Sequence, residues 1–207
     1  MDISLNQFSY YQPTQARAER TFSLILKTAL TTIENEGIDA LNTNRVADDC
    51  EINISTLYHY FPNKDTIVYA LYKRWFEKIV AIAEHRREIL KPQTSYKKFY
   101  TLLISDFLSV EDYTPKAAVA LEQAIKIRSE LAEYDKMVTE ASIGGYIEDL
   151  KRFGAQGSPA ELLIPSSHIL IAVWGAISIA ADFPQEEHPR IVGYAVDMIT
   201  AVVKRTL

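Results

Sequence analysis

The chain has 207 residues, of which 48% are hydrophobic and 24% charged, with a formal net charge of −5. This balance is typical of a globular protein and excludes a wholly disordered chain. A single cysteine cannot form an internal disulfide, and one thiol with four histidines makes no zinc framework, so we expect no metal and no other cofactor.

The sequence predicts neither export nor membrane insertion. Residues 1–15 contain no Lys or Arg and no apolar core, unlike a secretory signal. Residues 162–181 lack charged side chains, but Pro165 and the polar residues after it leave an apolar run of only 13 residues. A membrane span needs about 20. We therefore expect a cytoplasmic protein without membrane contact, in which this segment lies in a core or a subunit interface.

The N-terminal third shows a long, short, short, long pattern of helices. Residues 22–33 carry one apolar stripe at helical spacing, and Gly37 ends that helix. Asn42 and Thr43 are candidate N-caps for a short helix that ends at Cys50. Asn53 can cap a second short helix over residues 54–61, and a longer helix starts at residue 64.

The rest of the chain also predicts helices. Prolines separate segments at about 94–109, 115–128, 129–154, 166–182 and 188–205, and no strand alternation or internal repeat is present. The sequence therefore predicts an all-α fold of about nine helices. The composition changes within the helix at residues 64–88, which indicates that a small N-terminal unit gives way there to a larger one.

Two short helices joined by about three residues form a helix-turn-helix geometry, which places its second helix in the major groove of DNA. Leu57 and Phe61 can face the core. The side chains that we expect to face outward are Ser55, Thr56, His59 and Tyr60. This geometry is not unique to DNA-binding proteins. Residues 15–64 carry five basic and seven acidic side chains, so a basic DNA-binding surface is missing. A helical protein-binding adaptor without DNA affinity is therefore an alternative.

Residues 42–65 resemble the helix-turn-helix signature of the TetR (tetracycline repressor) family of bacterial transcription regulators, with the core Thr56-Leu57-Tyr58-x-Tyr60-Phe61-x-Asn63-Lys64. The resemblance is strong over about residues 17–80, and beyond them only the helical layout and the length agree. It implies a homodimeric repressor that binds a palindromic double-stranded DNA operator and is released by a small apolar or aromatic effector. It divides the chain into a flexible N-terminal arm (1–16), a helix-turn-helix DNA-binding domain (17–64) and a ligand-binding and dimerisation domain (65–207).

The resemblance also implies roles for single residues. The base-facing positions are Ile54, Ser55, Thr56 and His59. Positions that hold the DNA backbone are Thr43, Tyr58, Tyr60 and Lys64, the last at a helix start whose free N–H groups favour a phosphate. Asn44 and Arg45 stand where the family sometimes reads an additional base. Glu51 and Ile54 depart from the family pattern, in which the turn residue is often glycine and the first recognition position is commonly polar.

The last two helices carry apolar side chains over a wide arc, which predicts cover from the protein's own core and from a second subunit. A four-helix bundle between two subunits is the simplest arrangement and is also what the resemblance implies. The alternative is that both helices are central to a monomer. The expected interface residues are Ile169, Val173, Ile177, Ile191, Ala195, Met198, Ile199 and Val202.

Aromatic residues are frequent between residues 96 and 174 and several can line an effector cavity, although core packing is the more common role of any single one. The candidate effector residues are Phe99, Phe107, Glu122, Tyr146, His168 and Trp174. The sequence contains no H-E-x-x-H, P-loop or G-x-S-x-G motif. We therefore expect no enzymatic activity.

Overall fold

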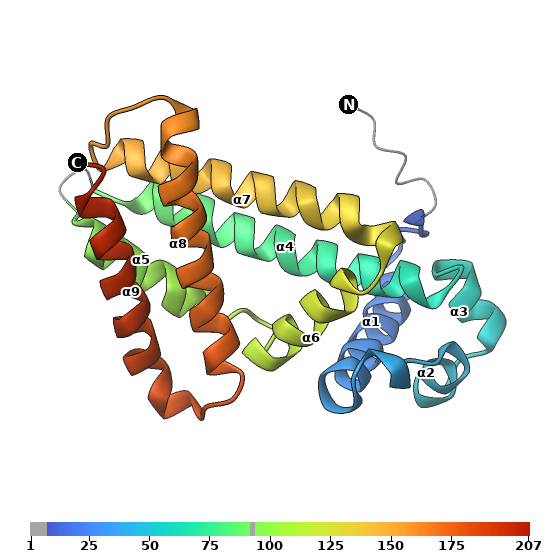
Figure 1. Cartoon of the computed structure of the whole chain (residues 1–207). Coiled ribbons are helices and arrows are strands. Elements are labelled where there is room, and N and C mark those ends of the chain that lie inside the picture. Colours follow the sequence, from blue (N-terminus) through green and yellow to red (C-terminus); the bar gives the residue numbers. More distant parts are fainter. Residues whose placement is uncertain (1–7, 92–93) are drawn as a thin grey trace. The chain divides into compact units, whose positions relative to one another are not determined.

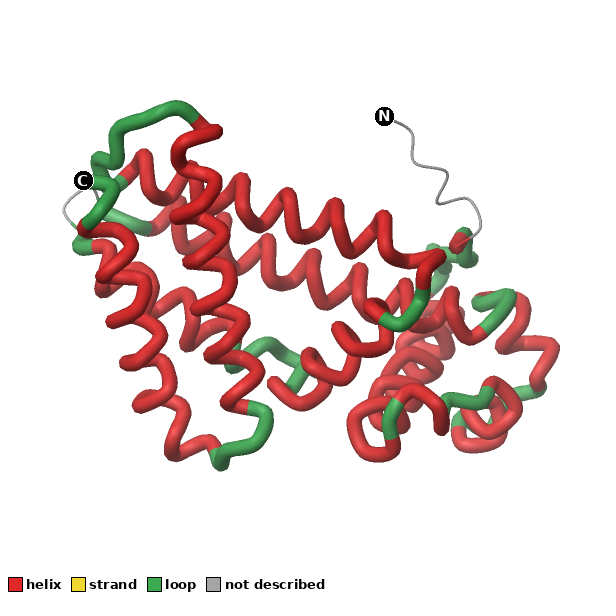
Figure 2. Tube along the Cα trace, viewed as in Figure 1, coloured by secondary structure: helices red, strands yellow, loops and turns green. Residues whose placement is uncertain are grey.

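The computed structural model describes residues 8–91 and 94–207, and these are helices and loops without a strand (Figure 2). This confirms the predicted all-α fold. The helices in chain order (Figure 1) are α1 (Ala16–Glu36), α2 (Thr43–Asp49), α3 (Ile54–Tyr60), α4 (Lys64–Ile89), α5 (Tyr96–Phe107), α6 (Pro115–Lys126), α7 (Ala132–Arg152), α8 (Pro159–Ala180) and α9 (His188–Lys204). Short 3-10 turns lie at Ile38–Ala40, Ser129–Leu131 and Gln185–Glu187. Pro92, one of the prolines used as a helix boundary, lies outside the described residues.

The chain forms two compact units. The first contains Met1–Phe76, described from residue 8, together with Ala117–Glu133. The second contains Glu77–Lys116 and Tyr134–Leu207. This division falls within α4, between Phe76 and Glu77. Ile67 and Leu71, in the first turns of α4, belong to the first unit and are buried.

The first unit is built on the apolar stripe of α1. Ile25 and Ile33 of this stripe are buried, and they share the core with Leu57 of α3 and with Phe61, which follows α3. Gly37 ends α1 with a φ of +83°, a conformation that glycine adopts without strain. Burial of each large side chain contributes about 1.5–3 kcal/mol. The core thus fixes α3 through its inward face and leaves the opposite face open.

The sequence predicts a flexible N-terminal arm over residues 1–16, but the part of it that the structure describes is packed. Residues 1–7 lie outside the described residues. Phe8 is buried, with its ring centroid 5.4 Å from that of Tyr69. Tyr10 stacks on Phe22 at 5.8 Å and lies 5.7 Å from Phe61. From residue 8 onward the segment is therefore packed on the first unit.

In the second unit, α8 packs along α9, and α5 packs against both (Figure 1). Helix α8 starts at Pro159 and not at residue 166, because Ser158 forms a capping box with Glu161. The backbone N–H of Ser158 donates to the Glu161 carboxylate at 2.7 Å. Pro165 lies inside this helix, although the sequence analysis took it as a break.

Helix α8 is long and apolar enough to cross a membrane by length and composition, with a mean hydropathy of 1.8 over 18 residues. The core helix of a soluble protein passes the same test. In the structure 39% of that window is buried, and the helix packs against α5 and α9. Several apolar side chains of this helix nevertheless remain exposed, among them Ile164 and Ile171.

Candidate nucleic-acid interface

Helices α2 and α3 are set by local capping and a tight turn. The Asn42 side chain caps α2 by accepting from the backbone N–H groups of Asn44 (2.9 Å) and Arg45 (3.3 Å). The turn closes through Ile52 N–H, which donates to the Ala47 carbonyl at 3.0 Å. Asn53 caps α3 through its backbone carbonyl and not, as expected, through its side chain. The two helices form the predicted helix-turn-helix.

Glu51 occupies the turn position at which the family pattern often has glycine. Its φ is +52°, in the left-handed region that glycine adopts without strain and other residues rarely enter. The turn geometry of the motif is therefore kept although the residue differs. The cost is a strained backbone and an exposed carboxylate close to the candidate DNA surface.

The inward face of α3 is larger than the sequence analysis expected. Leu57 and Phe61 are buried, as predicted, but Tyr60 is also only 6% exposed. Its ring packs at 6.0 Å from the ring of Phe22. Because Tyr60 lies three residues after Leu57, the two share one side of the helix. The expectation that Tyr60 faces outward is therefore corrected.

The outward face of α3 consists of polar and aromatic side chains. Ser55, Tyr58 and His59 are exposed, whereas Ile54 and Thr56 are half-buried. Ser55 and His59 lie four residues apart and share one side, and Tyr58 lies about 100° around the helix from His59. These are short hydroxyl, phenol and imidazole groups, which can reach base edges or phosphates.

A recess of about 280 Å³ lies beside Tyr58. The hydroxyls of Thr43 and Tyr58 lie 3.1 Å apart and are hydrogen-bonded. Lys64, at the first residue of α4, also lines the recess and is exposed. The remaining residues that line it are Leu41, Asn42, Asn44, Pro62 and Asn63. The recess thus brings together three of the predicted backbone-contacting residues, which come from α2, α3 and α4.

Arg45 is held in an ion pair with α1. Its guanidinium donates two hydrogen bonds to the Glu36 carboxylate, at 2.7 and 2.6 Å, and lies 3.7 Å from Asp49. The hydrogen bonds to Arg45 lower the pKa of Glu36, and those to Glu36 raise the pKa of Arg45. Arg45 can reach a base only if it leaves these partners.

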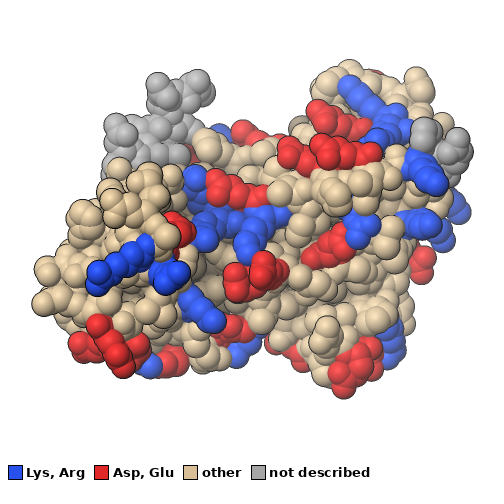
Figure 3. All heavy atoms as spheres, turned by 180° about the vertical axis from the view of Figure 1, so that it is seen from behind, with Lys and Arg blue, Asp and Glu red and all other residues tan. Residues whose placement is uncertain are grey.

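Charge alone does not mark the DNA surface. On the face of the molecule in Figure 3, basic and acidic side chains lie next to one another. Around the motif, the exposed acidic residues Asp48, Asp49 and Glu51 offset the basic ones. Any phosphate binding therefore depends on the local recess.

The candidate effector residues lie in different surroundings. Phe99, Phe107 and Tyr146 are buried, and the Phe99 ring packs 5.5 Å from that of Phe153. Trp174 is half-buried. Glu122 belongs to the first unit and pairs with Lys126. His168 is exposed and lines a separate recess of about 430 Å³.

A buried ion pair lies next to this aromatic cluster, and no pattern in the sequence predicts it. Arg87 of α4 donates to both carboxylate oxygens of Asp149 of α7, at 2.7 and 3.0 Å. The Asp149 side chain is 1% exposed. Desolvation raises the pKa of Asp149, and the Arg87 guanidinium opposes that rise. A Cβ atom at Gly145 would lie 2.9 Å from the Arg87 guanidinium, so this glycine leaves room for the pair.

The phenols beside this ion pair are also shielded from water. Burial raises the pKa of Tyr100 and of Tyr146 above the ordinary range of tyrosine. Among the described residues, the Tyr100 hydroxyl has no hydrogen-bond partner. A buried hydroxyl without a partner is unusual in a native core.

The predicted dimer residues are divided between the core and the surface. Helices α8 and α9 pack on each other, and five of the predicted residues are buried within the protomer. The buried members are Ile169, Val173, Ile177, Ala195 and Ile199. Ile191 and Val202 are half-buried, and Met198 is 53% exposed. These five residues, which were predicted to form the subunit interface, therefore lie in the core of the protomer.

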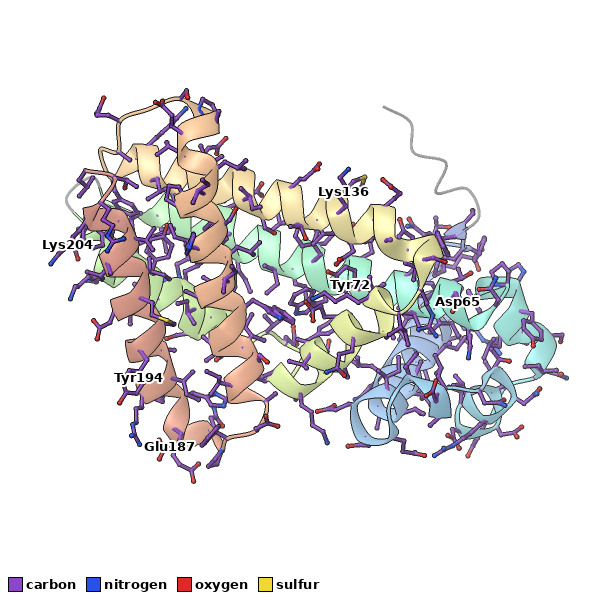
Figure 4. The ribbon with its side chains drawn as sticks, viewed as in Figure 1. Asp65, Tyr72, Lys136, Glu187, Tyr194 and Lys204 are labelled. Atoms are coloured by element: carbon purple, nitrogen blue, oxygen red, sulfur yellow. The ribbon has the colours of Figure 1, made fainter. Side chains whose placement is uncertain are left out.

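A different set of apolar side chains is exposed on the same two helices. Ile171 of α8 is 67% exposed and Tyr194 of α9 is 63% exposed. Figure 4 labels Tyr194 on α9. Ile164 and Ile179 of α8 are exposed as well. With Met198, these five residues are called the α8–α9 outer face below.

Comparison with known proteins agrees with this geometry. The family model described as "Bacterial regulatory proteins, tetR family" matches residues 25–71, which cover α2, α3 and parts of α1 and α4. The uncharacterized HTH-type transcriptional regulator YuxN of Bacillus subtilis is 23% identical over 138 residues. These are 66% of this chain and 47% of that protein, so the chain spans about half the length of the curated relative that it matches.

Solved structures share the fold over nearly the whole chain. SCO4454, a TetR-family transcriptional regulator from Streptomyces coelicolor, has a TM-score of 0.71 at 15% identity, over 91% of this chain and 96% of that one. The multidrug binding protein EbrR complexed with imidazole has a TM-score of 0.63 at 15% identity, over 93% and 97%.

The matched motif, the outward face of α3 and the all-helical fold agree with one another. The matching family model describes regulatory proteins. Residues 25–71 therefore match the helix-turn-helix region of the TetR family, and the chain shares its overall fold with solved TetR-family regulators.

Proposed function

We propose that this protein is a homodimeric repressor that binds a palindromic operator in double-stranded DNA through α3, in the cytoplasm. The observation that carries the proposal is the outward face of α3 with Ser55, Tyr58 and His59, next to a recess that contains Lys64. A major groove about 12 Å wide admits one helix with such short side chains.

The recess is suited to one phosphate of the operator. The Lys64 ammonium supplies the charge, and the hydroxyls of Thr43 and Tyr58 can each turn to donate a hydrogen bond. Asn63 keeps the first turn of α4 in place, because its side chain accepts from Thr66 N–H at 2.9 Å. Base contacts then come from Ser55 and His59, with Asn44 beside the recess.

The experiment is a selection of duplexes from a random double-stranded library, followed by fluorescence anisotropy on the selected duplex at two salt concentrations. We expect an enriched palindrome and an affinity that falls as salt rises, because phosphate contacts release counterions. An unenriched library, or a DNA affinity independent of salt, would contradict the proposal. That outcome is the one expected of a protein-binding adaptor without DNA affinity.

The dimer follows from the same proposal. A palindrome presents two half-sites about 34 Å apart, so two copies of α3 must be held together. The α8–α9 outer face is apolar and extends over two helices, as a subunit interface in a four-helix bundle would. A second copy of this chain is the partner that we propose for this face.

For the effector, we propose a small molecule with an aromatic or apolar body and one polar group. Two observations support it: the fold is shared with a protein named for multidrug binding, and the buried aromatic cluster contains the unpartnered Tyr100 hydroxyl. The ligand would release DNA by favouring one spacing of the two recognition helices. The test is a thermal-shift screen of aromatic compounds. A hit should also dissociate the operator and lose affinity in Tyr100→Phe, and a hit without either effect would argue against this site.

A further inference from the structure

The segment before α1 touches the recognition helix directly. Tyr11 N–H donates to the carbonyl oxygen of Tyr60, the last residue of α3, at 3.1 Å. The ring of Tyr11 lies 4.8 Å from that of His59. The last four carbonyls of a helix have no partner within it, so this contact satisfies one of them. The N-terminal segment is thus a fixed neighbour of the outward face of α3.

The position of Tyr11 is determined by the residues before it. Phe8 and Tyr10 pack into the aromatic core around Tyr69, Phe22 and Phe61. Tyr11, by contrast, is 44% exposed. The core therefore holds the segment through Phe8 and Tyr10, while one side of the Tyr11 ring packs 5.8 Å from the ring of Tyr60 and the rest stays exposed. An exposed, fixed tyrosine at a binding surface is free to contact a ligand.

Tyr11 and the phosphate recess flank α3 in different directions. Tyr58 faces the recess with Thr43 and Lys64. His59, about 100° further around the helix, faces Tyr11. A helix in the major groove lies between two sugar–phosphate strands. When the recess holds one strand, the side of α3 that carries His59 and Tyr11 is turned toward the other.

We propose that Tyr11 is a DNA-contacting residue, whose ring supports His59 and whose hydroxyl donates a hydrogen bond to a phosphate of the strand opposite the one bound in the recess. The proposal rests on the proposed function and extends its contact surface to the N-terminal segment. Tyrosine hydroxyls are among the groups that commonly bind DNA phosphates.

The first test measures the affinity of the full chain for the selected duplex by fluorescence anisotropy. In Tyr11→Phe the ring stays on His59 and only the hydroxyl is lost. We expect the affinity to fall about fivefold, the effect of one hydrogen bond. Tyr96→Phe is the matched control, because Tyr96 is a partly exposed tyrosine on α5 of the second unit. It should bind as the wild type does.

The second test locates the contact. Neutral methylphosphonates are placed one at a time along both strands of the duplex. At one phosphate of the strand opposite the recess, the substitution should weaken wild-type binding and have no further effect in Tyr11→Phe. Likewise, a methylphosphonate at one phosphate of the recess strand should weaken wild-type binding and have no further effect in Lys64→Met.

The outcomes separate the two proposals. If the wild type binds the duplex, Lys64→Met weakens it and Tyr11→Phe does not, the role of Tyr11 is refuted and the function stands. If Tyr11→Phe lowers the affinity by the same factor on every methylphosphonate duplex, Tyr11 contacts no particular phosphate, and the inference is likewise refuted. If the wild type selects no duplex, both proposals fail.

Discussion

Replacing Arg87 with methionine tests the buried ion pair of the second unit. The substitution removes both hydrogen bonds to Asp149 and leaves a carboxylate whose side chain is 1% exposed. Breaking one partner of a buried pair costs about 3–5 kcal/mol, because the remaining charge has lost its compensation. Arg86→Met is the matched control. Arg86 is the neighbouring residue on α4 and also pairs with one carboxylate, that of Asp106, but Asp106 is 30% exposed. We expect a cost of about 1 kcal/mol there.

The destabilisation caused by Arg87→Met should grow as the pH rises. Burial already raises the pKa of Asp149 in the folded protein, and loss of Arg87 removes the group that opposes this rise. The folded state of Arg87→Met then holds the Asp149 proton more tightly than the unfolded state does. Its stability is highest below the unfolded pKa of aspartate, about 3.9, and falls as the pH rises until the folded pKa is passed.

The assay is urea denaturation of the wild type, Arg87→Met, Arg86→Met and the double variant Arg87→Met/Asp149→Leu at pH 5 and pH 7.5. The cost of Arg87→Met should be larger at pH 7.5. The double variant should recover most of the loss at both values, since apolar residues of similar volume can replace a buried pair. A cost that is equal at both pH values, or equal to that of Arg86→Met, would refute the reasoning.

Three further outcomes are expected. Glu51→Gly should raise the free energy of unfolding by about 0.5–1 kcal/mol in urea titrations, because relief of the left-handed strain exceeds the entropic cost of glycine; Glu51→Gln should not, and a gain there would assign the effect to charge. Lys64→Met should reduce the slope of log affinity against log salt by about 1, and an unchanged slope would remove Lys64 from the phosphate site. Met198→Glu should convert the sedimenting dimer to a folded monomer, whereas Ile199→Glu should unfold the chain. A wild-type monomer at micromolar concentration would contradict the dimer.

The helix-turn-helix was predictable because its determinants are local. Asn42 caps α2, Gly37 ends α1, and the stripe on α1 has helical spacing. Each of these signals involves residues that are close together in the sequence. Leu57 and Phe61 were assigned to the core for the same reason. Such signals depend on chain geometry and do not require knowledge of the tertiary partner.

The errors concern residues whose environment is set by distant parts of the chain. Tyr60 carries a hydroxyl and an apolar ring, and only the position of Phe22 shows that the ring is buried. The sequence offered no sign that Arg45 would pair with Glu36, because the two lie on different helices. Arg128 similarly pairs with Asp65 at 2.5 Å, which links residues 117–133 to the start of α4 within the first unit.

The assignment of α8 and α9 shows why an apolar arc alone does not identify an interface. Both helices are apolar on two neighbouring stripes, and either stripe satisfies the requirement for a core. The structure assigns Ile199 and Ile177 to the core and leaves Met198 and Ile171 exposed. The exposed stripe and the high hydropathy of α8 point to the same conclusion. A helix that is apolar all round but packed on just one side exposes apolar surface, and a second packing partner would bury it. In the proposed dimer, a second copy of the chain would provide that cover and, by the same contact, the second recognition helix that a palindromic operator requires. The proposal therefore couples the dimer to the DNA contact: disruption of the α8–α9 outer face in Met198→Glu should weaken binding to the full palindrome far more than binding to an isolated half-site.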